Sequence, residues 1–143
     1  MIALDEARAA VIREHGRRTY PEECCGALLG RFVDGIATVE AARAIANVRE
    51  DGRRRRFLVD PRDYLEVERE ADRQGLTVLG FYHSHPDHPA APSDFDRRHA
   101  WPNLHYVIVA VEAGVPREMT SWLLSEDRSI MREESILLAR RTA

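Results

Sequence analysis

A short apolar segment that leads into two closely spaced histidines constrains this chain more than any other feature. Residues 76–82 are rich in β-branched and aromatic types, and they are followed at once by His83-Ser84-His85-Pro86. A continuous apolar run of this length is typical of a strand buried on both faces. Pro86 has no backbone N–H for a strand ladder, so it predicts where this strand ends.

The strand geometry brings the two imidazoles together. Successive side chains of a strand point to opposite faces, so we expect one side to carry Thr77, Leu79, Phe81, His83 and His85. At about 3.3 Å rise per residue, the two histidine backbones lie roughly 6.6 Å apart. Side chains that converge from this separation can reach one ion with bonds of about 2.0–2.1 Å. The spacing therefore predicts a pair of metal ligands.

A carboxylate follows after a short loop that contains prolines. The run Pro92-Ser93-Asp94-Phe95-Asp96 predicts the start of a helix, with Ser93 as its N-cap and Asp96 in its first turn. Two imidazoles and one carboxylate are a ligand set of open catalytic zinc sites. Ser93 and Asp96 also fit a capping box, which needs no metal. Imidazole and carboxylate suit iron or manganese as well, so the identity of the metal stays open here.

Two adjacent glutamates precede a second buried segment. The run reads Glu22-Glu23-Cys24-Cys25-Gly26. Sequence alone does not orient two neighbouring carboxylates, so Glu22 and Glu23 are rival candidates for a catalytic base. Cys25 is expected to pack as a small apolar residue, because free cysteine is commonly buried. Two adjacent cysteines form a poor disulfide framework.

Together these segments resemble the JAMM motif of MPN-domain (Mov34/PAD-1) metallopeptidases. The resemblance runs through most of the chain, from the first expected helix to Trp122. It implies that His83, His85 and Asp96 bind one zinc ion. The family's Glu-x-Cys-Gly pattern selects Glu23 over Glu22 as the base that takes a proton from the attacking water and passes it to the leaving amine. It implies further that Ser93 stabilises the oxyanion of the tetrahedral intermediate.

The expected elements alternate between helices and strands, which indicates an α/β fold, and hairpin signals indicate a mixed sheet. The MPN resemblance implies a curved mixed β-sheet flanked by helices, in a layout like that of cytidine deaminases. We expect helices at 2–15 (apolar face Leu4, Ala7, Val11 and Ile12, ending near Gly16), 60–74 (ending at Gly75) and 95–101. We expect strands at 26–33, 36–46, 57–59, 76–85, 105–111, 118–124 and 129–133, with turns at Asp34-Gly35, Asp51-Gly52 and Glu126-Asp127.

Composition narrows the functional classes. The 143 residues fit a single domain, 1–143. All 21 basic residues are arginine, which excludes a Schiff-base or P-loop lysine. The net charge of −3 gives no reason to expect nucleic acid as a partner, and no apolar run is long enough to span a membrane. The arginine run 53–56 is expected to be a solvated loop, or else a contact for an acidic partner.

The resemblance implies a zinc-dependent metallopeptidase or isopeptidase, most like the compact stand-alone prokaryotic members. Its implied partner is a small ubiquitin-like or sulfur-carrier protein with a Gly-Gly tail, from which it would release an attached cysteine or another C-terminal extension. Two adjacent cysteines and the lack of a signal-peptide pattern predict a cytoplasmic protein. A homodimer stays open, because the sequence does not fix the oligomeric state.

Three other readings belong to different classes. A non-catalytic MPN scaffold would usually have lost its metal ligands, and this chain keeps them. A DNA-associated RadC-type relative would carry His-Asn-His-Pro in place of His83-Ser84-His85-Pro86. A zinc deaminase would carry a Pro-Cys-x-x-Cys signature, which this chain lacks.

Overall fold

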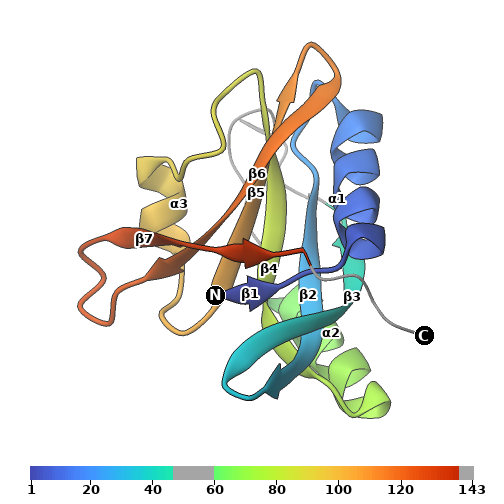
Figure 1. Cartoon of the computed structure of the whole chain (residues 1–143), viewed down its shortest axis with the longest axis vertical. Coiled ribbons are helices and arrows are strands. Elements are labelled where there is room, and N and C mark those ends of the chain that lie inside the picture. The colour runs from blue at the N-terminus through green and yellow to red at the C-terminus, as the bar shows by residue number, and fades with distance from the viewer. Residues whose placement is uncertain (47–59, 139–143) are drawn as a thin grey trace.

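The computed structural model of the chain describes residues 1–46 and 60–138, which form eight strands and three helices (Figure 1). The strands are β1 (Ile2–Ala3), β2 (Cys25–Val33), β3 (Ile36–Ile45), β4 (Thr77–Pro86), β5 (His105–Glu112), β6 (Val115–Leu124), β7 (Met131–Glu134) and β8 (Ile136–Leu137). The helices are α1 (Glu6–Thr19), α2 (Pro61–Gln74) and α3 (Asp94–His99).

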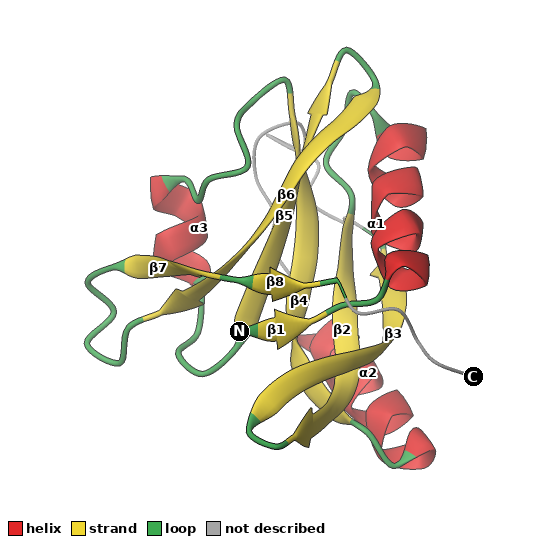
Figure 2. Cartoon of the chain, viewed as in Figure 1, coloured by secondary structure: helices red, strands yellow, loops and turns green. Residues whose placement is uncertain are grey.

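All eight strands belong to one mixed sheet in the order β7-β6-β5-β4-β2-β3-β1-β8. β4 pairs antiparallel with β2 and parallel with β5, so the strand that carries the histidines lies in the middle of the sheet. β7 and β8 follow each other in the chain, and they pair with opposite ends of the sheet, β6 and β1. Figure 2 shows this segment crossing from one edge to the other, so the curved sheet nearly closes.

The helices cover opposite faces of the sheet. Ala9 and Ile12 of α1 pack with Tyr82 in a cluster that we name the α1-side core. Val67 of α2 packs with Phe81 in a second cluster, the α2-side core. Since Phe81 and Tyr82 are neighbours in β4, the two faces of this strand are both buried, as its continuous apolar run predicts. The predicted mixed α/β architecture with flanking helices is confirmed.

The first helix differs from its prediction. Ile2–Ala3 forms β1, and α1 begins only at Glu6, because the side chain of Asp5 caps it by accepting a hydrogen bond from the Arg8 N–H. Gly16 does not end the helix. A Cβ added at Gly16 would lie 3.1 Å from Val111 Cγ2, so this glycine allows the close packing of α1 on β5. The predicted apolar face was wrong in part: Ala7 and Val11 are exposed, whereas Ala9 is buried.

The strand with the histidines contains a bulge that the alternation argument did not anticipate. Leu28 pairs with Gly80 and Leu29 pairs with Val78, so Leu79 is an extra residue in β4. Leu79 therefore packs in the α1-side core, while Phe81 packs in the α2-side core. The expectation that Leu79 shares a face with Phe81 is wrong. Beyond the bulge, Phe81 and His83 line the same pocket, so their predicted common face is confirmed.

The remaining elements agree with their predictions to within a few residues. The hairpin turn at Asp34-Gly35 has positive φ at both residues. Asp60 caps α2, and Gly75 ends it in the left-handed conformation. The predicted turn at Asp51-Gly52, the arginine run 53–56 and the predicted strand 57–59 lie outside the described residues. No helix in the described parts of the chain is long and apolar enough to cross a membrane.

Gly80 lies directly against the backbone of the neighbouring strand, so its replacement tests this part of the fold. A Cβ at Gly80 would lie 1.8 Å from the backbone oxygen of His105 in β5. We expect Gly80→Ala to lower the free energy of unfolding by at least about 3 kcal/mol in urea titrations, at the upper end for overpacking. Gly35→Ala is the control: it has positive φ but meets no atom within 4 Å, and should cost only about 1–2 kcal/mol. Equal losses in the two variants would contradict the steric account.

Candidate metal and catalytic site

The site forms where the C-terminal end of β4 meets the beginnings of β2 and α3. His83 and His85 project from the end of β4, on the face that α2 and α3 occupy. Cys25 at the start of β2 pairs with His83, so the antiparallel register brings the segment just before β2 beside His85. Asp96 lies in the first turn of α3, as predicted. Three separate elements thus deliver buried polar side chains to one place.

The three predicted ligands converge on one point. The Nε2 atoms of His83 and His85 are 3.2 Å apart. Asp96 Oδ2 lies 3.1 Å from the Nε2 of His85 and 3.4 Å from the Nε2 of His83. Ligands that surround a tetrahedral zinc ion at about 2.0–2.1 Å are separated from one another by about 3.3 Å. The three donor atoms therefore have the spacing that a zinc ion requires.

The tautomer of His85 favours a cation at this point. His85 Nδ1 lies 2.8 Å from the carbonyl oxygen of Pro89. A carbonyl oxygen only accepts, so Nδ1 carries the proton and donates it. In the neutral ring the Nε2 lone pair then faces the carboxylate of Asp96, which is repulsive unless a cation lies between them. This backbone contact is the usual way in which a metal-binding histidine is oriented.

The charge states of the cluster fit the same conclusion. Burial lowers the pKa of His83, which favours the neutral ring that a metal requires. Burial alone would raise the pKa of Asp96, but the neighbouring His83 and the hydrogen bond from the Ser93 N–H hold it well below its usual range. Asp96 is thus ionised, and its second oxygen, Oδ1, is buried without a hydrogen-bond partner among the described residues. A buried anion beside two imidazoles suits a divalent cation.

Glu23 is the fourth buried polar side chain of the cluster. Its carboxylate oxygen and one ring nitrogen each of His83 and His85 lie within 4.8 Å of one another. Burial, and secondarily the charge of Asp96, raise the pKa of Glu23 to about 9. Glu22 is exposed, so the structure places Glu23 and not its rival beside the histidines.

Either carboxylate could complete a three-ligand set with the two histidines. Asp96 Oδ2 lies 3.1–3.4 Å from both Nε2 atoms, and a carboxylate oxygen of Glu23 lies within 4.8 Å of one ring nitrogen of each histidine. The Asp96 distances match the spacing of ligands around one small ion, so Asp96 stays the predicted ligand. Glu23 stays the predicted base, next to the two histidines.

Ser93 is the N-cap of α3 and stands next to the cluster. Its Oγ accepts a hydrogen bond from the Asp96 N–H at 3.1 Å, and its own N–H donates to Asp96 Oδ2 at 2.9 Å. The predicted capping box is therefore present together with the predicted ligand geometry. A serine hydroxyl that accepts from a backbone N–H still has its hydrogen to donate. The capping contact thus does not rule out a catalytic role.

Ser84 supports the site in a way that the sequence did not indicate. Its buried Oγ accepts a hydrogen bond from the Cys24 N–H at 2.8 Å, and its own N–H donates to the Cys24 carbonyl at 3.2 Å. These bonds fix the segment that carries Glu23 against the strand that carries both histidines. No signal in the sequence separates this serine from the other small residues of β4.

The other candidate residues lie outside the cluster. His88 is exposed, and His105 pairs with Glu134 at 2.6 Å. Cys25 is buried in the α2-side core, as expected, and its Sγ lies 3.3 Å from the Ile45 carbonyl. The four histidines that do not contribute are His15, His88, His99 and His105.

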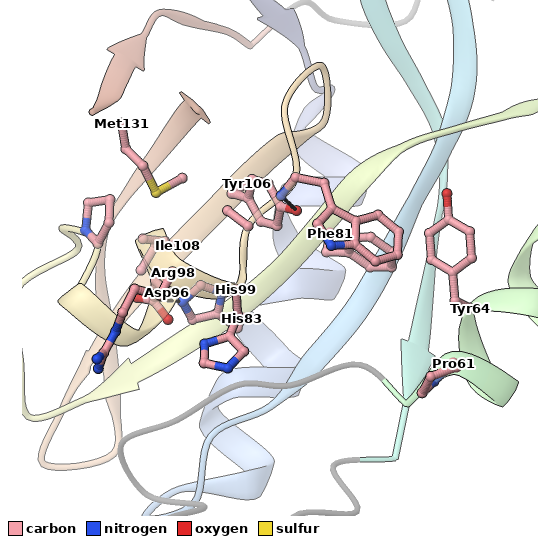
Figure 3. Close-up of a pocket in the computed structure, with 13 residues that line it drawn as sticks. Pro61, Tyr64, Phe81, His83, Asp96, Arg98, His99, Tyr106, Ile108 and Met131 are labelled. Atoms are coloured by element: carbon pink, nitrogen blue, oxygen red, sulfur yellow. Dashed lines mark hydrogen bonds and ion pairs between the residues drawn. The ribbon is translucent and has the colours of Figure 1, made fainter. Parts of the chain in front are cut away.

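An apolar pocket adjoins the cluster on the α2 side, and no pattern in the sequence indicated it. Its volume is about 240 Å³, and His83 and Asp96 are among the residues that line it (Figure 3). Its walls come from α2, β4, α3 and the segment that follows it, β5, and the start of β7, which are distant in the chain. We name it the aromatic pocket after the side chains that line it, chiefly Tyr64, Phe81, Trp101, Tyr106, Ile108 and Met131.

A family model for prokaryotic homologs of the JAB domain matches residues 5–125. The chain belongs to this family. It is 34% identical to a desampylase of Haloferax volcanii over 107 residues, which are 72% of this chain and 75% of that protein. It is 32% identical to a probable TtuB-protein conjugate cleaving protease of Thermus thermophilus over 127 residues, which are 89% of this chain and 75% of that protein.

Solved structures agree with this JAB-family assignment. A protein of Desulfitobacterium hafniense matches with a TM-score of 0.86 and 34% identity, over 99% of this chain and 94% of that one. A JAB1/MPN domain protein of Archaeoglobus fulgidus matches with a TM-score of 0.62 and 16% identity, over 98% of both chains. The second likeness concerns the fold alone. The predicted family and MPN fold are confirmed.

Proposed function

We propose that this JAB-family protein is a zinc-dependent peptidase that cleaves an amide bond at the C-terminal tail of a small ubiquitin-like or sulfur-carrier protein. The observation that carries the proposal is the convergence of three donor atoms at 3.1–3.4 Å with Glu23 beside them. The names of the two relatives, a desampylase and a conjugate-cleaving protease, support the same class. The chain is therefore a hydrolase of peptide or isopeptide bonds.

The side chains divide the chemistry among them. A zinc ion held by His83, His85 and Asp96 would supply a Lewis acid that polarises the scissile carbonyl and lowers the pKa of a water molecule. A cation held beside Glu23 would favour the ionised form of this carboxyl, against the burial that raises its pKa. The ionised Glu23 accepts the proton of the attacking water and delivers it to the amine that leaves. Burial of all four side chains keeps bulk water away, which strengthens each electrostatic contact.

The finer substrate assignment rests on the family resemblance. A tail that ends in Gly-Gly suits a narrow cleft, because glycine has no side chain, and an extended tail can pair with strand backbone. The bond cleaved would join the last glycine to an attached cysteine, to another C-terminal extension or to a lysine. The cytoplasmic location, the single domain 1–143 and a homodimer remain predictions.

The proposal is tested by mass spectrometry of carrier adducts before and after incubation with the zinc-loaded protein. The substrates are TtuB and ubiquitin, each with a C-terminal cysteine extension or an isopeptide-linked lysine. We expect release of the extension at the glycine, and none with His83→Ala. Intact adducts throughout the panel would contradict the proposal. A scaffold that only binds would show zinc and carrier binding without turnover.

The two roles of Ser93 can be separated by two substitutions. Ser93→Ala removes both the capping acceptor and the hydroxyl donor. We expect the free energy of unfolding to fall by about 0.5–2 kcal/mol. We expect kcat to fall by roughly 10²–10³-fold. Ser93→Asp keeps a capping acceptor but has no hydrogen to donate at neutral pH. It should restore the stability and leave kcat low. Recovery of kcat in Ser93→Asp would show that Ser93 serves the helix only.

A further inference from the structure

Four aromatic side chains of the aromatic pocket contact one another in series. The rings of Tyr64 and Trp101 have centroids 5.1 Å apart, and those of Tyr64 and Phe81 are 5.7 Å apart. The ring centroids of Phe81 and Tyr106 are 6.3 Å apart. The Tyr106 hydroxyl accepts a hydrogen bond from the backbone N–H of Trp101 at 2.8 Å. Four rings thus form one continuous wall, in the range of separations at which aromatic pairs attract.

The polar and apolar ends of this pocket are distinct. Figure 3 shows His83, Asp96, Arg98 and His99 gathered at one end, with Tyr64 and Pro61 at the other. The pocket therefore opens directly from the metal cluster and becomes apolar away from it. Its volume of about 240 Å³ is below the range of about 300–1,000 Å³ for sites of drug-sized ligands. It has room for a single side chain.

Its position limits which residue of a substrate can enter. His83 and Asp96 belong both to the metal cluster and to the pocket, so the pocket begins within reach of the two residues that flank the scissile bond. On the acyl side of that bond the proposed substrate carries glycine, which has nothing to insert. The residue on the other side, whose amine leaves, is the one that remains.

We propose that the aromatic pocket binds a large apolar side chain, such as that of phenylalanine or leucine, on the residue released from the carrier's tail. This inference rests on the proposed function and adds a leaving-group specificity to it. The reaction is a hydrolysis: the C–N bond breaks, the water oxygen bonds to the glycine carbonyl carbon, and the amine departs with the transferred proton. The bound side chain holds this amine beside Glu23.

Adducts that differ in the released residue test this inference. The probes are TtuB and ubiquitin, each with a C-terminal Gly-Gly-X in which X is Gly, Ala, Cys, Leu or Phe. We expect kcat/KM to rise from Gly to Leu and Phe by roughly 10–200-fold, the range for a side chain that fills an apolar pocket. Trp101 is 50% exposed, so Trp101→Ala should leave the fold intact. This variant should lose most of the preference for Phe over Gly, measured as the ratio of the two kcat/KM values.

Phe32→Ala provides the matched control, because Phe32 is an aromatic residue that is 58% exposed and lies outside the pocket. It should keep the full preference. Equal rates for all five adducts would overturn the pocket assignment and leave the proposed function standing. A preference for Phe that Trp101→Ala does not reduce would also overturn it. So would a kcat/KM that depends on the carrier residues before Gly-Gly and not on the residue X. Failure to cleave any adduct would remove the proposed function, and the pocket assignment with it.

Discussion

Replacing Glu23 by glutamine should lower kcat by about 10²–10⁴-fold, with little change in the zinc content of the protein. Glutamine matches glutamate in size but cannot accept the proton of the attacking water. The buried position of Glu23 within 4.8 Å of both histidine donors gives this residue its expected role. Steady-state kinetics on a cleaved carrier adduct, with metal analysis of the same sample, measures both quantities.

Glu22→Gln is the matched control for this prediction. Glu22 is the preceding residue, carries the same carboxylate and is exposed. It should retain the activity of the unmodified protein. If Glu23→Gln lost zinc as well as activity, Glu23 would be a metal ligand in place of Asp96. If it kept full activity, the proton would be carried by another group.

Replacing His83 by alanine should abolish zinc binding and reduce turnover to the background rate. The three donor atoms hold the ion only together, and His83 contributes one of the two imidazoles. Zinc at about 100 times its dissociation constant should stabilise the unmodified protein by about 2.7 kcal/mol, and it should not stabilise the variant. Thermal unfolding with and without zinc measures this difference, and a chelator should inactivate the unmodified protein reversibly.

His88→Ala separates loss of a ligand from loss of any histidine in this loop. His88 lies three residues after His85 but is exposed. This variant should bind zinc and turn over as the unmodified protein does. A His83→Ala protein that still bound one zinc ion with full activity would contradict the assignment of the site.

The residues of the metal cluster could be predicted because most of them are close together in the sequence. The imidazoles of His83 and His85 are two residues apart on a strand, and the capping pattern from Ser93 places Asp96 in the first turn of a helix. Over such short spacings, the periodicity of a strand or a helix determines which side chains point to the same face. The choice of Glu23 over Glu22 came from the resemblance to a family motif, and the different burial of the two side chains agrees with it.

Other features depend on contacts between distant segments, which periodicity does not encode. The bulge at Leu79 arises from how β2 and β4 pair, and it reverses the face of one residue. Gly16 was expected to end a helix, but it serves the packing of α1 against Val111. The aromatic pocket joins Tyr64 and Trp101, which belong to elements with no local pattern in common. Only the folded arrangement reveals these relationships.

The central claim is that His83, His85 and Asp96 hold one divalent cation beside Glu23. Anomalous diffraction at the zinc absorption edge, from crystals grown with zinc, tests it most directly. The account predicts one peak at about 2.0–2.2 Å from both Nε2 atoms and from Asp96 Oδ2, with Glu23 beyond bonding distance. No peak in the cluster, or a peak bonded to Glu23 with Asp96 turned away, would contradict it.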